Sequence, residues 1–361
     1  MSAIEPRIWS ATEFKKESSP ANLFKRHRGT ALQLIDQTLD RWDELCHEGA
    51  EARRKELVVS QLMTACKNWL TDKGTKTTST ATERKLAVES LGEQAFQWIK
   101  WRKFHQRKAD PGNAAVQKRA MRPGYQVERT MYMASGKARN PVSGSYIHSV
   151  MEGVGTFGTR TFATLTPADF RTLDNAYVGE VNQPDPMGDP GSMAKTKMPR
   201  MVLFLKKQDR IKHLMIVQHG LLYEGFEKPL HTGGGGFTVA YVIDEYGNLY
   251  CSTETFDRTY SFNHSTFNAG KDVICAGTLS ADQGNIRLLT NLSGHYKPTR
   301  DNLHNAVQFV ANAGASLAQA RVWVNEPDPG RPGKMIQYEY SQAQTFLANR
   351  NAPPNQTFPE P

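Results

Sequence analysis

The chain has 361 residues, of which 39% are hydrophobic, and a formal net charge of +9. This length allows two domains or one large one, and the apolar content is sufficient to bury a core. No apolar run approaches the roughly 20 residues needed to cross a bilayer, and the N-terminus lacks the pattern of a secretory signal peptide. The four cysteines form no CxxC pair and have no close histidine, which argues against a zinc site and for reduced thiols.

The positive charge is concentrated in the first part of the chain. Residues 1–140 contain 26 basic and 16 acidic residues, a net charge of about +10, whereas the remainder is close to neutral. Such an asymmetry is typical of two parts with different roles. We therefore expect a basic helical domain over residues 1–140.

Three helices are expected in this first part. Apolar residues recur at helical spacing over residues 22–50 and again over residues 51–74, which predicts a helical hairpin. Thr80 and Glu83 have the spacing of a capping box and begin a third helix that ends near residue 110. Three helices of this length predict a small bundle.

The second part has short strand-like runs, which begin near residue 213 and continue to about residue 327. Between two of these runs, Gly247 and Asn248 tolerate the backbone of a tight turn and predict a hairpin. One clear helix begins near residue 300 and stops at Gly314. We expect an α+β protein in which an N-terminal helical bundle precedes a mixed or antiparallel sheet domain with flanking helices, at residues 145–326, and an extended proline-rich tail at residues 327–361.

Two stretches of the sheet domain carry candidate chemistry, "FNHSTFNAG" at 262–270 and "SGHYKPT" at 293–299. Neutral imidazoles beside hydroxyl groups are suited to general base or nucleophilic catalysis. The candidate catalytic residues, which a short antiparallel sheet could gather in one cleft, are His231, His264, Ser265, His295 and Tyr296. An alternative is structural: Ser265 caps a short helix, and the histidines are bonded to backbone. No histidine pair has the local spacing of a metal motif, so no metal is expected.

Two further motifs precede these stretches, "LHTGG" at 230–234 and "YVIDEYGNLYCS" at 241–252. In this order the motifs resemble the core of the plant IQ-motif calmodulin-binding protein family. They are also similar to a C-terminal domain of bacterial polymorphic toxins. Asn263 and Thr278 depart from the toxin pattern, in which histidine and glutamate are usual at these places.

The toxin resemblance implies an enzyme class, the ADP-ribosyltransferases, with NAD as the cofactor. In this hypothesis His231, Thr232 and Ser265 contact NAD. A secreted bacterial effector would be made in the cytoplasm and exported without a cleavable signal peptide. It would act on a target protein in a host or competitor cell, and an immunity protein would be a further partner. No glutamate follows at the place that the family uses to stabilise the ribosyl cation. This effector hypothesis is our first functional interpretation.

The alternative is binding without catalysis. Residues 95–108, "AFQWIKWRKFHQRK", mix aromatic and basic side chains in the manner of basic amphipathic helices that bind calmodulin or anionic membranes. The candidate partner-binding residues are Trp98, Trp101, Arg102 and Phe104. The same aromatic residues could instead form the core of the helical bundle. "FQWIKWRK" lacks the glycine and the arginine spacing of an IQ motif. Residues 95–139 contain 11 basic and 2 acidic residues, but no nucleic-acid motif accompanies this charge, so nucleic acid is not the expected partner.

Overall fold

The chain divides into two compact units. The computed structural model describes residues 4–19, 29–74, 79–109, 181–182, 200–202, 205, 207–233, 237–244, 246–252, 260–261, 264–268, 273–293, 296, 298–331 and 334–359. The first unit contains the residues up to Ala109 together with Tyr223–Pro229, and the second contains the rest. The expected domain boundary near residue 140 lies outside the described residues.

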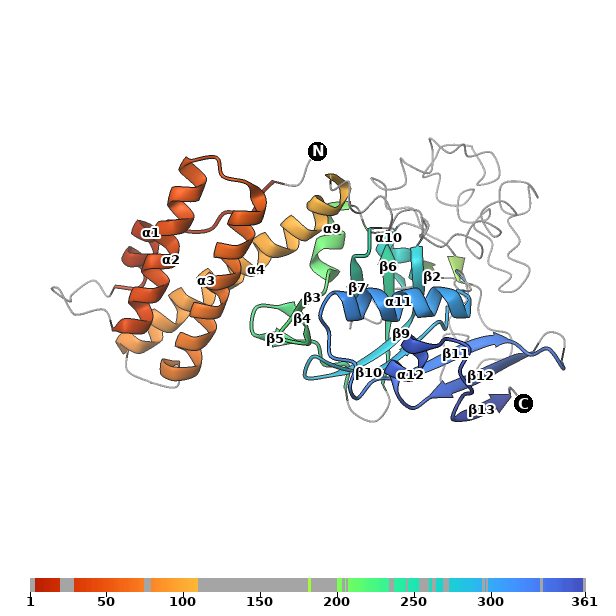
Figure 1. The fold of residues 1–361 in the computed structure, drawn as a ribbon. Coiled ribbons are helices and arrows are strands. Elements are labelled where there is room, and N and C mark those ends of the chain that lie inside the picture. The colour runs from red at the N-terminus through yellow and green to blue at the C-terminus, as the bar shows by residue number, and fades with distance from the viewer. Residues whose placement is uncertain are drawn as a thin grey trace, which may run out of the picture. The chain divides into compact units, whose positions relative to one another are not determined.

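The described residues of the first unit form four helices (Figure 1). The expected helical part of the fold is therefore confirmed, with one short helix in addition, which begins after a capping box formed by Ser10 and Glu13. The helices bury leucine, isoleucine and aromatic side chains against one another, among them Ile35, Leu62 and Leu91, which are fully buried. The four helices are α1 (Ala11–Glu17), α2 (Thr30–His47), α3 (Ala52–Lys73) and α4 (Ser79–Ala109).

A β-hairpin completes this unit. Strand β4 (Leu221–Gly225) turns through Phe226 and Glu227 into β5 (Lys228–Pro229), and the pairing places Tyr223 opposite Pro229. Its residues Tyr223–Pro229 belong to the helical unit although they lie far from the helices in sequence.

The second unit is organised around a seven-stranded sheet with the order β13-β12-β11-β10-β9-β6-β7. All neighbouring strands are antiparallel except β10 and β11, which are parallel and therefore require a crossover connection. Helix α11 (Arg300–Asn312) supplies that crossover. The strands are β6 (Val239–Asp244), β7 (Leu249–Cys251), β9 (Val273–Asp282), β10 (Asn285–Thr290), β11 (Arg321–Pro327), β12 (Met335–Tyr340) and β13 (Gln356–Pro359).

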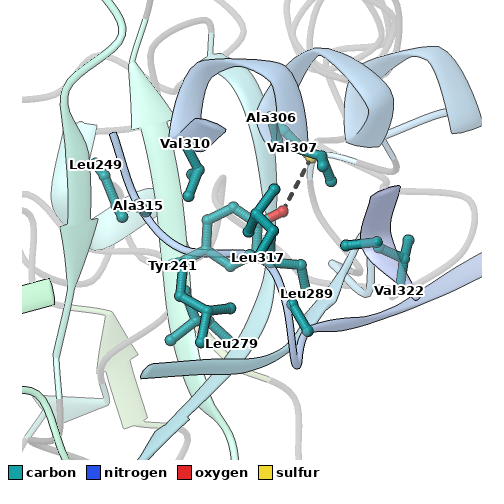
Figure 2. Close-up of a cluster of buried hydrophobic side chains, with 14 of the residues drawn as sticks. Tyr241, Leu249, Leu279, Leu289, Ala306, Val307, Val310, Ala315, Leu317 and Val322 are labelled. Carbon is teal, nitrogen blue, oxygen red and sulfur yellow. Dashed lines mark hydrogen bonds between the residues drawn. The ribbon is translucent and has the colours of Figure 1, made fainter. Parts of the chain in front are cut away.

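The core of this unit lies between the sheet and α11. Figure 2 shows Tyr241 of β6 among Ala306, Val307 and Val310 of the helix, with Leu289 of β10 close by. The Tyr241 hydroxyl donates to the Thr290 carbonyl at 2.9 Å, so its polar end is satisfied inside the apolar layer. The remaining described elements are β1 (Val181–Asn182), β2 (Arg200–Val202), α9 (Lys207–Arg210), η5 (Ile211–His213), β3 (Ile216–Gln218), β8 (Tyr260–Ser261), α10 (His264–Asn268) and α12 (Ala343–Ala348).

The C-terminal residues differ from the expected extended tail. Residues 335–359 form β12, α12 and β13, and the two strands extend the sheet. The reason is packing: Phe346 and Tyr340 are fully buried, and the Tyr340 hydroxyl donates to the carbonyl of Ala352 at 2.9 Å. The proline content misled the prediction, because Pro359 stands at the end of an edge strand, where a missing N–H is tolerated.

The four cysteines, all within the described residues, are free thiols. Burial raises the pKa of Cys66 above its usual range, and that of Cys275 to about 12. No helix among the described residues is long and apolar enough to cross a membrane.

Candidate functional site

His231 lies on the surface beside the end of strand β9. Its Nδ1 is 3.3 Å from the Asp282 carboxylate, and both side chains are about half exposed. The same carboxylate also accepts from Arg287 at 3.2 Å. A protonated His231 would therefore make an exposed ion pair, which contributes little to stability.

Thr232, a candidate for cofactor contact, is engaged with the backbone of β9. Its amide donates to the carbonyl of Ala281 at 3.0 Å, and its hydroxyl lies 3.2 Å from both the amide and the carbonyl of that residue. The hydroxyl also donates to the carbonyl of Phe237 at 3.0 Å. In this arrangement Thr232 joins two segments of chain to the sheet.

His264 is the first residue of α10 and is half-buried. Its Nε2 lies 2.8 Å from the carbonyl oxygen of Gly277. Because a carbonyl only accepts, Nε2 carries the proton in this contact. Gly277 itself is required by close packing, since a Cβ at this position would lie 1.9 Å from the carbonyl oxygen of Thr290. The two residues fix α10 against the centre of the sheet.

The described geometry does not bring His231 and His264 into one hydrogen-bonded group. His264 contacts Gly277, whereas His231 lies beside Asp282, five residues farther along β9. At about 3.3 Å per residue these two contact points are about 16 Å apart. Tyr296 is buried, and its amide donates to the Ser293 hydroxyl at 3.5 Å.

Two of the candidate catalytic residues are not fully described. His295 lies outside the described residues, and of Ser265 only its place in α10 is described. The assignment of catalytic and cofactor contacts to these residues stays a prediction. Among the residues that the structure describes, no group of three or more His, Cys, Asp or Glu side chains could hold a metal ion.

A buried carboxylate that the sequence analysis did not single out lies at the end of β6. Asp244 accepts from the amides of Tyr246 and Asn248 at 2.9 and 2.8 Å. It also accepts from the Asn248 side chain at 2.9 Å and from the Tyr250 hydroxyl at 3.0 Å. Burial, together with this carboxylate, raises the pKa of Tyr250 well above its usual value. The turn sequence "DEYGN" was the available signal, because Asp commonly accepts from amides two residues on.

Asn291 has a similar structural role at the end of β10. Its side-chain amide donates to the carbonyls of Pro298 and Asn325 at 2.7 and 2.9 Å, and its oxygen accepts from the Asn325 amide at 2.7 Å. Asn302 donates to the carbonyl of Ile274 at 3.1 Å. Asn291 and Asn302 thus hold a loop and a helix against the sheet.

The candidate partner-binding residues of α4 are divided between core and surface. Trp98 and Phe104 are buried. The Trp98 indole meets Trp42 edge-on, with ring centroids 5.4 Å apart, and donates to Glu5 at 2.7 Å. Trp101 and Arg102 are half-buried. In this structure Trp98 and Phe104 are not exposed anchors, because the unit uses them as core. The role of all four residues in partner binding stays a prediction.

Lys100 of the same helix is also buried. Its ammonium group donates to the carbonyl of Glu224 in the hairpin at 2.6 Å and lies 5.4 Å from the centre of the Phe96 ring. Burial lowers the pKa of Lys100 from 10.5 to about 8, although Glu93 and Glu224 act in the opposite direction. Lys100, a basic residue of the predicted binding segment, is therefore part of an internal contact of this unit.

The sequence comparisons relate part of the sheet domain to a known protein family. Residues 209–303 match the IQ motif-containing protein middle domain. They contain β6, β7, α10, β9, β10 and the start of α11, and thus Asp244 and His264, together with Asn291, which follows β10.

Individual relatives are plant proteins. IQ domain-containing protein IQM3 of Arabidopsis thaliana is 27% identical over 34% of this chain and 26% of its own length. IQ domain-containing protein IQM1 of the same plant is 29% identical over 39% of this chain and 30% of its own length. The chain thus spans less than a third of the relatives it matches. No solved structure matches this chain with significance.

These findings correct the effector hypothesis. The similar proteins are plant IQ domain-containing proteins, and the comparisons do not show the similarity to bacterial toxins. The hypothesis of a secreted toxin that transfers ADP-ribose is therefore wrong. The expectations of NAD as a cofactor and of export without a cleavable signal peptide are not tested by these findings.

Proposed function

We propose that this protein is a non-enzymatic protein-binding module whose partner is calmodulin or an acidic protein of that kind. The observation that carries the proposal is the match of residues 209–303 to a domain of IQ motif-containing proteins. The relatives are similarly described as IQ domain-containing proteins. The hydrogen bonds of Asp244 and Asn291 add support, because they engage these polar side chains in turns and loops of the fold.

The binding element in this proposal is the basic segment of α4 at residues 95–108. The chain has no complete IQ motif, and this segment has the composition that comes nearest to one. Lys100, Arg102 and Lys103 provide cations on it, which would favour an acidic partner and speed its association.

The test is a calorimetric titration of the full chain with calmodulin, with and without Ca²⁺. We expect binding that weakens with added salt, because exposed charges are screened. Lys103→Glu should weaken it about three- to tenfold, the effect of losing one favourable charge contact of roughly 1 kcal/mol. Arg53→Glu, an equal change of charge at an exposed position of α3, is the control and should leave the affinity unchanged. Absence of binding at about 100 µM calmodulin, a concentration that detects even weak complexes, refutes the proposal.

A further inference from the structure

The hairpin formed by Tyr223–Pro229 is held on helices α3 and α4 by polar contacts at several points. Glu93 of α4 accepts from the amide of Phe226 at 3.0 Å. Lys67 of α3 donates to the hydroxyl of Tyr223 at 3.2 Å and lies 3.4 Å from the carboxylate of Glu227. Lys100 of α4 contributes a further hydrogen bond, to the backbone carbonyl of Glu224 in the hairpin. The hairpin is thus bound by side chains from both helices.

Gly92 of α4 is matched to the hairpin by shape. A Cβ at Gly92 would lie 2.1 Å from the ring of Phe226, far inside contact distance. Glycine in the interior of a helix costs about 1 kcal/mol relative to alanine, so its presence there has a packing reason. The missing side chain makes room for the aromatic ring of the hairpin.

The covered surface is one stripe of α4. Gly92, Phe96 and Lys100 are spaced by four residues and therefore lie on the same face of the helix. The hairpin contacts the first and the third of these residues, so it crosses the position of Phe96 between them, and Phe96 is fully buried. This stripe begins before the basic segment of the proposed function and ends within it, since Phe96 and Lys100 belong to residues 95–108.

The charges on the two sides of the contact are complementary. Lys67 and Lys100 face the hairpin from α3 and α4, and the hairpin carries Glu224 and Glu227. Two further charges lie in the contact, Glu93 on the helix and Lys228, which pairs with Glu224 at 2.7 Å. The helices therefore receive an acidic segment with an aromatic residue at its turn.

We propose that this hairpin is a displaceable internal occupant of the α3–α4 surface, and that an acidic protein partner competes with it for the Phe96 and Lys100 stripe. This inference rests on the proposed function, since it names the surface on α4 that a calmodulin-type partner uses. The segment "YEGFEKP" supplies the chemistry that the surface recognises: the Glu227 carboxylate opposite Lys67, a backbone carbonyl opposite Lys100, and an aromatic ring opposite a glycine.

Two substitutions release the hairpin by opposite routes. Phe226→Ala removes the ring that fills the space above Gly92. Gly92→Ala adds a methyl group in that space and favours the helix itself, so loss of hairpin contact cannot be attributed to a weakened helix. The matched control is Phe237→Ala, a phenylalanine of the other unit that is 70% exposed.

The experiment measures amide exchange of residues 223–229 in the full chain, and calmodulin affinity by calorimetry, for each variant. Both substitutions should raise exchange of the hairpin. Phe226→Ala leaves the helical surface unchanged, so it should also tighten calmodulin binding by at least about tenfold, as expected when a competitor that occupies more than about nine-tenths of the molecules is removed. In the wild type, saturating calmodulin should raise exchange of the same residues, because the competition is reciprocal. The control should behave as the wild type in both measurements.

Four other outcomes contradict the inference, and one of them also contradicts the proposed function. Unchanged affinity of Phe226→Ala, when its hairpin exchanges faster, overturns the inference and leaves the proposed function intact. Unchanged exchange in both variants shows that Phe226 does not hold the hairpin and overturns the inference as well. Tighter binding by the control overturns it too, and absence of binding in every variant overturns the proposed function together with the inference.

Discussion

Lys100 allows a quantitative test of the packing of the helical unit. Burial lowers its pKa from 10.5 to about 8, so the unfolded chain keeps this proton to a higher pH than the folded chain does. Between about pH 8 and 10.5 the unfolded state therefore binds more protons, and the contribution of this group makes stability rise with pH. Below about pH 8 both states are protonated, and the folded state carries the full cost of burying the charge, about 3 kcal/mol.

The perturbation is Lys100→Met, which keeps the length of the side chain and removes the charge. At pH 7 it removes that cost and loses one charge-assisted hydrogen bond to the Glu224 carbonyl, worth about 1.5–3 kcal/mol. We expect the variant to be as stable as the wild type or up to about 2 kcal/mol more stable, as is common when a buried charge is replaced by an apolar group. The difference should shift in favour of the wild type by pH 10.

Tryptophan fluorescence during urea unfolding is the suitable assay. Of the six tryptophans of the chain, five lie in the helical unit: Trp9, Trp42, Trp69, Trp98 and Trp101. Trp323→Phe removes the sixth, so that the signal reports on this unit alone. Identical pH dependence of the wild type and Lys100→Met between pH 7 and 10 would refute the account of Lys100 as a buried charge.

Two further expectations concern the sheet unit. Asp244→Ala should lower its free energy of unfolding by about 3–4 kcal/mol, because four donors, including the buried Tyr250 hydroxyl, lose their acceptor. Asp282→Ala, at a half-exposed carboxylate, should cost less than about 1 kcal/mol, and equal losses measured by circular dichroism in urea would contradict the role given to Asp244. Gly277→Ala should be strongly destabilising, because its methyl group would overlap the Thr290 carbonyl, and a melting temperature within about 2 °C of the wild type would show that the strands can separate at no cost.

The sequence by itself determined the order and type of the main elements. Helical spacing of apolar residues located α2, α3 and α4, and Gly247 marked the β6–β7 turn, where its φ is 76°. These features depend on neighbours within a few residues, which the sequence displays directly. The order of the short motifs also pointed to the IQ-motif family, to whose middle domain residues 209–303 are similar.

Only the tertiary structure decided what individual side chains do. Lys100 and Trp98 look like the two faces of a basic amphipathic helix, yet both are buried, because Trp42 and the hairpin cover them. The partners of Lys100 and Gly92 lie more than a hundred residues away in the sequence. In the same way, whether His264 is a catalytic base or a donor to the Gly277 carbonyl depends on a contact between α10 and β9. The periodicity of apolar residues indicates which face of a helix or strand is apolar, but it does not indicate which distant segment will cover that face.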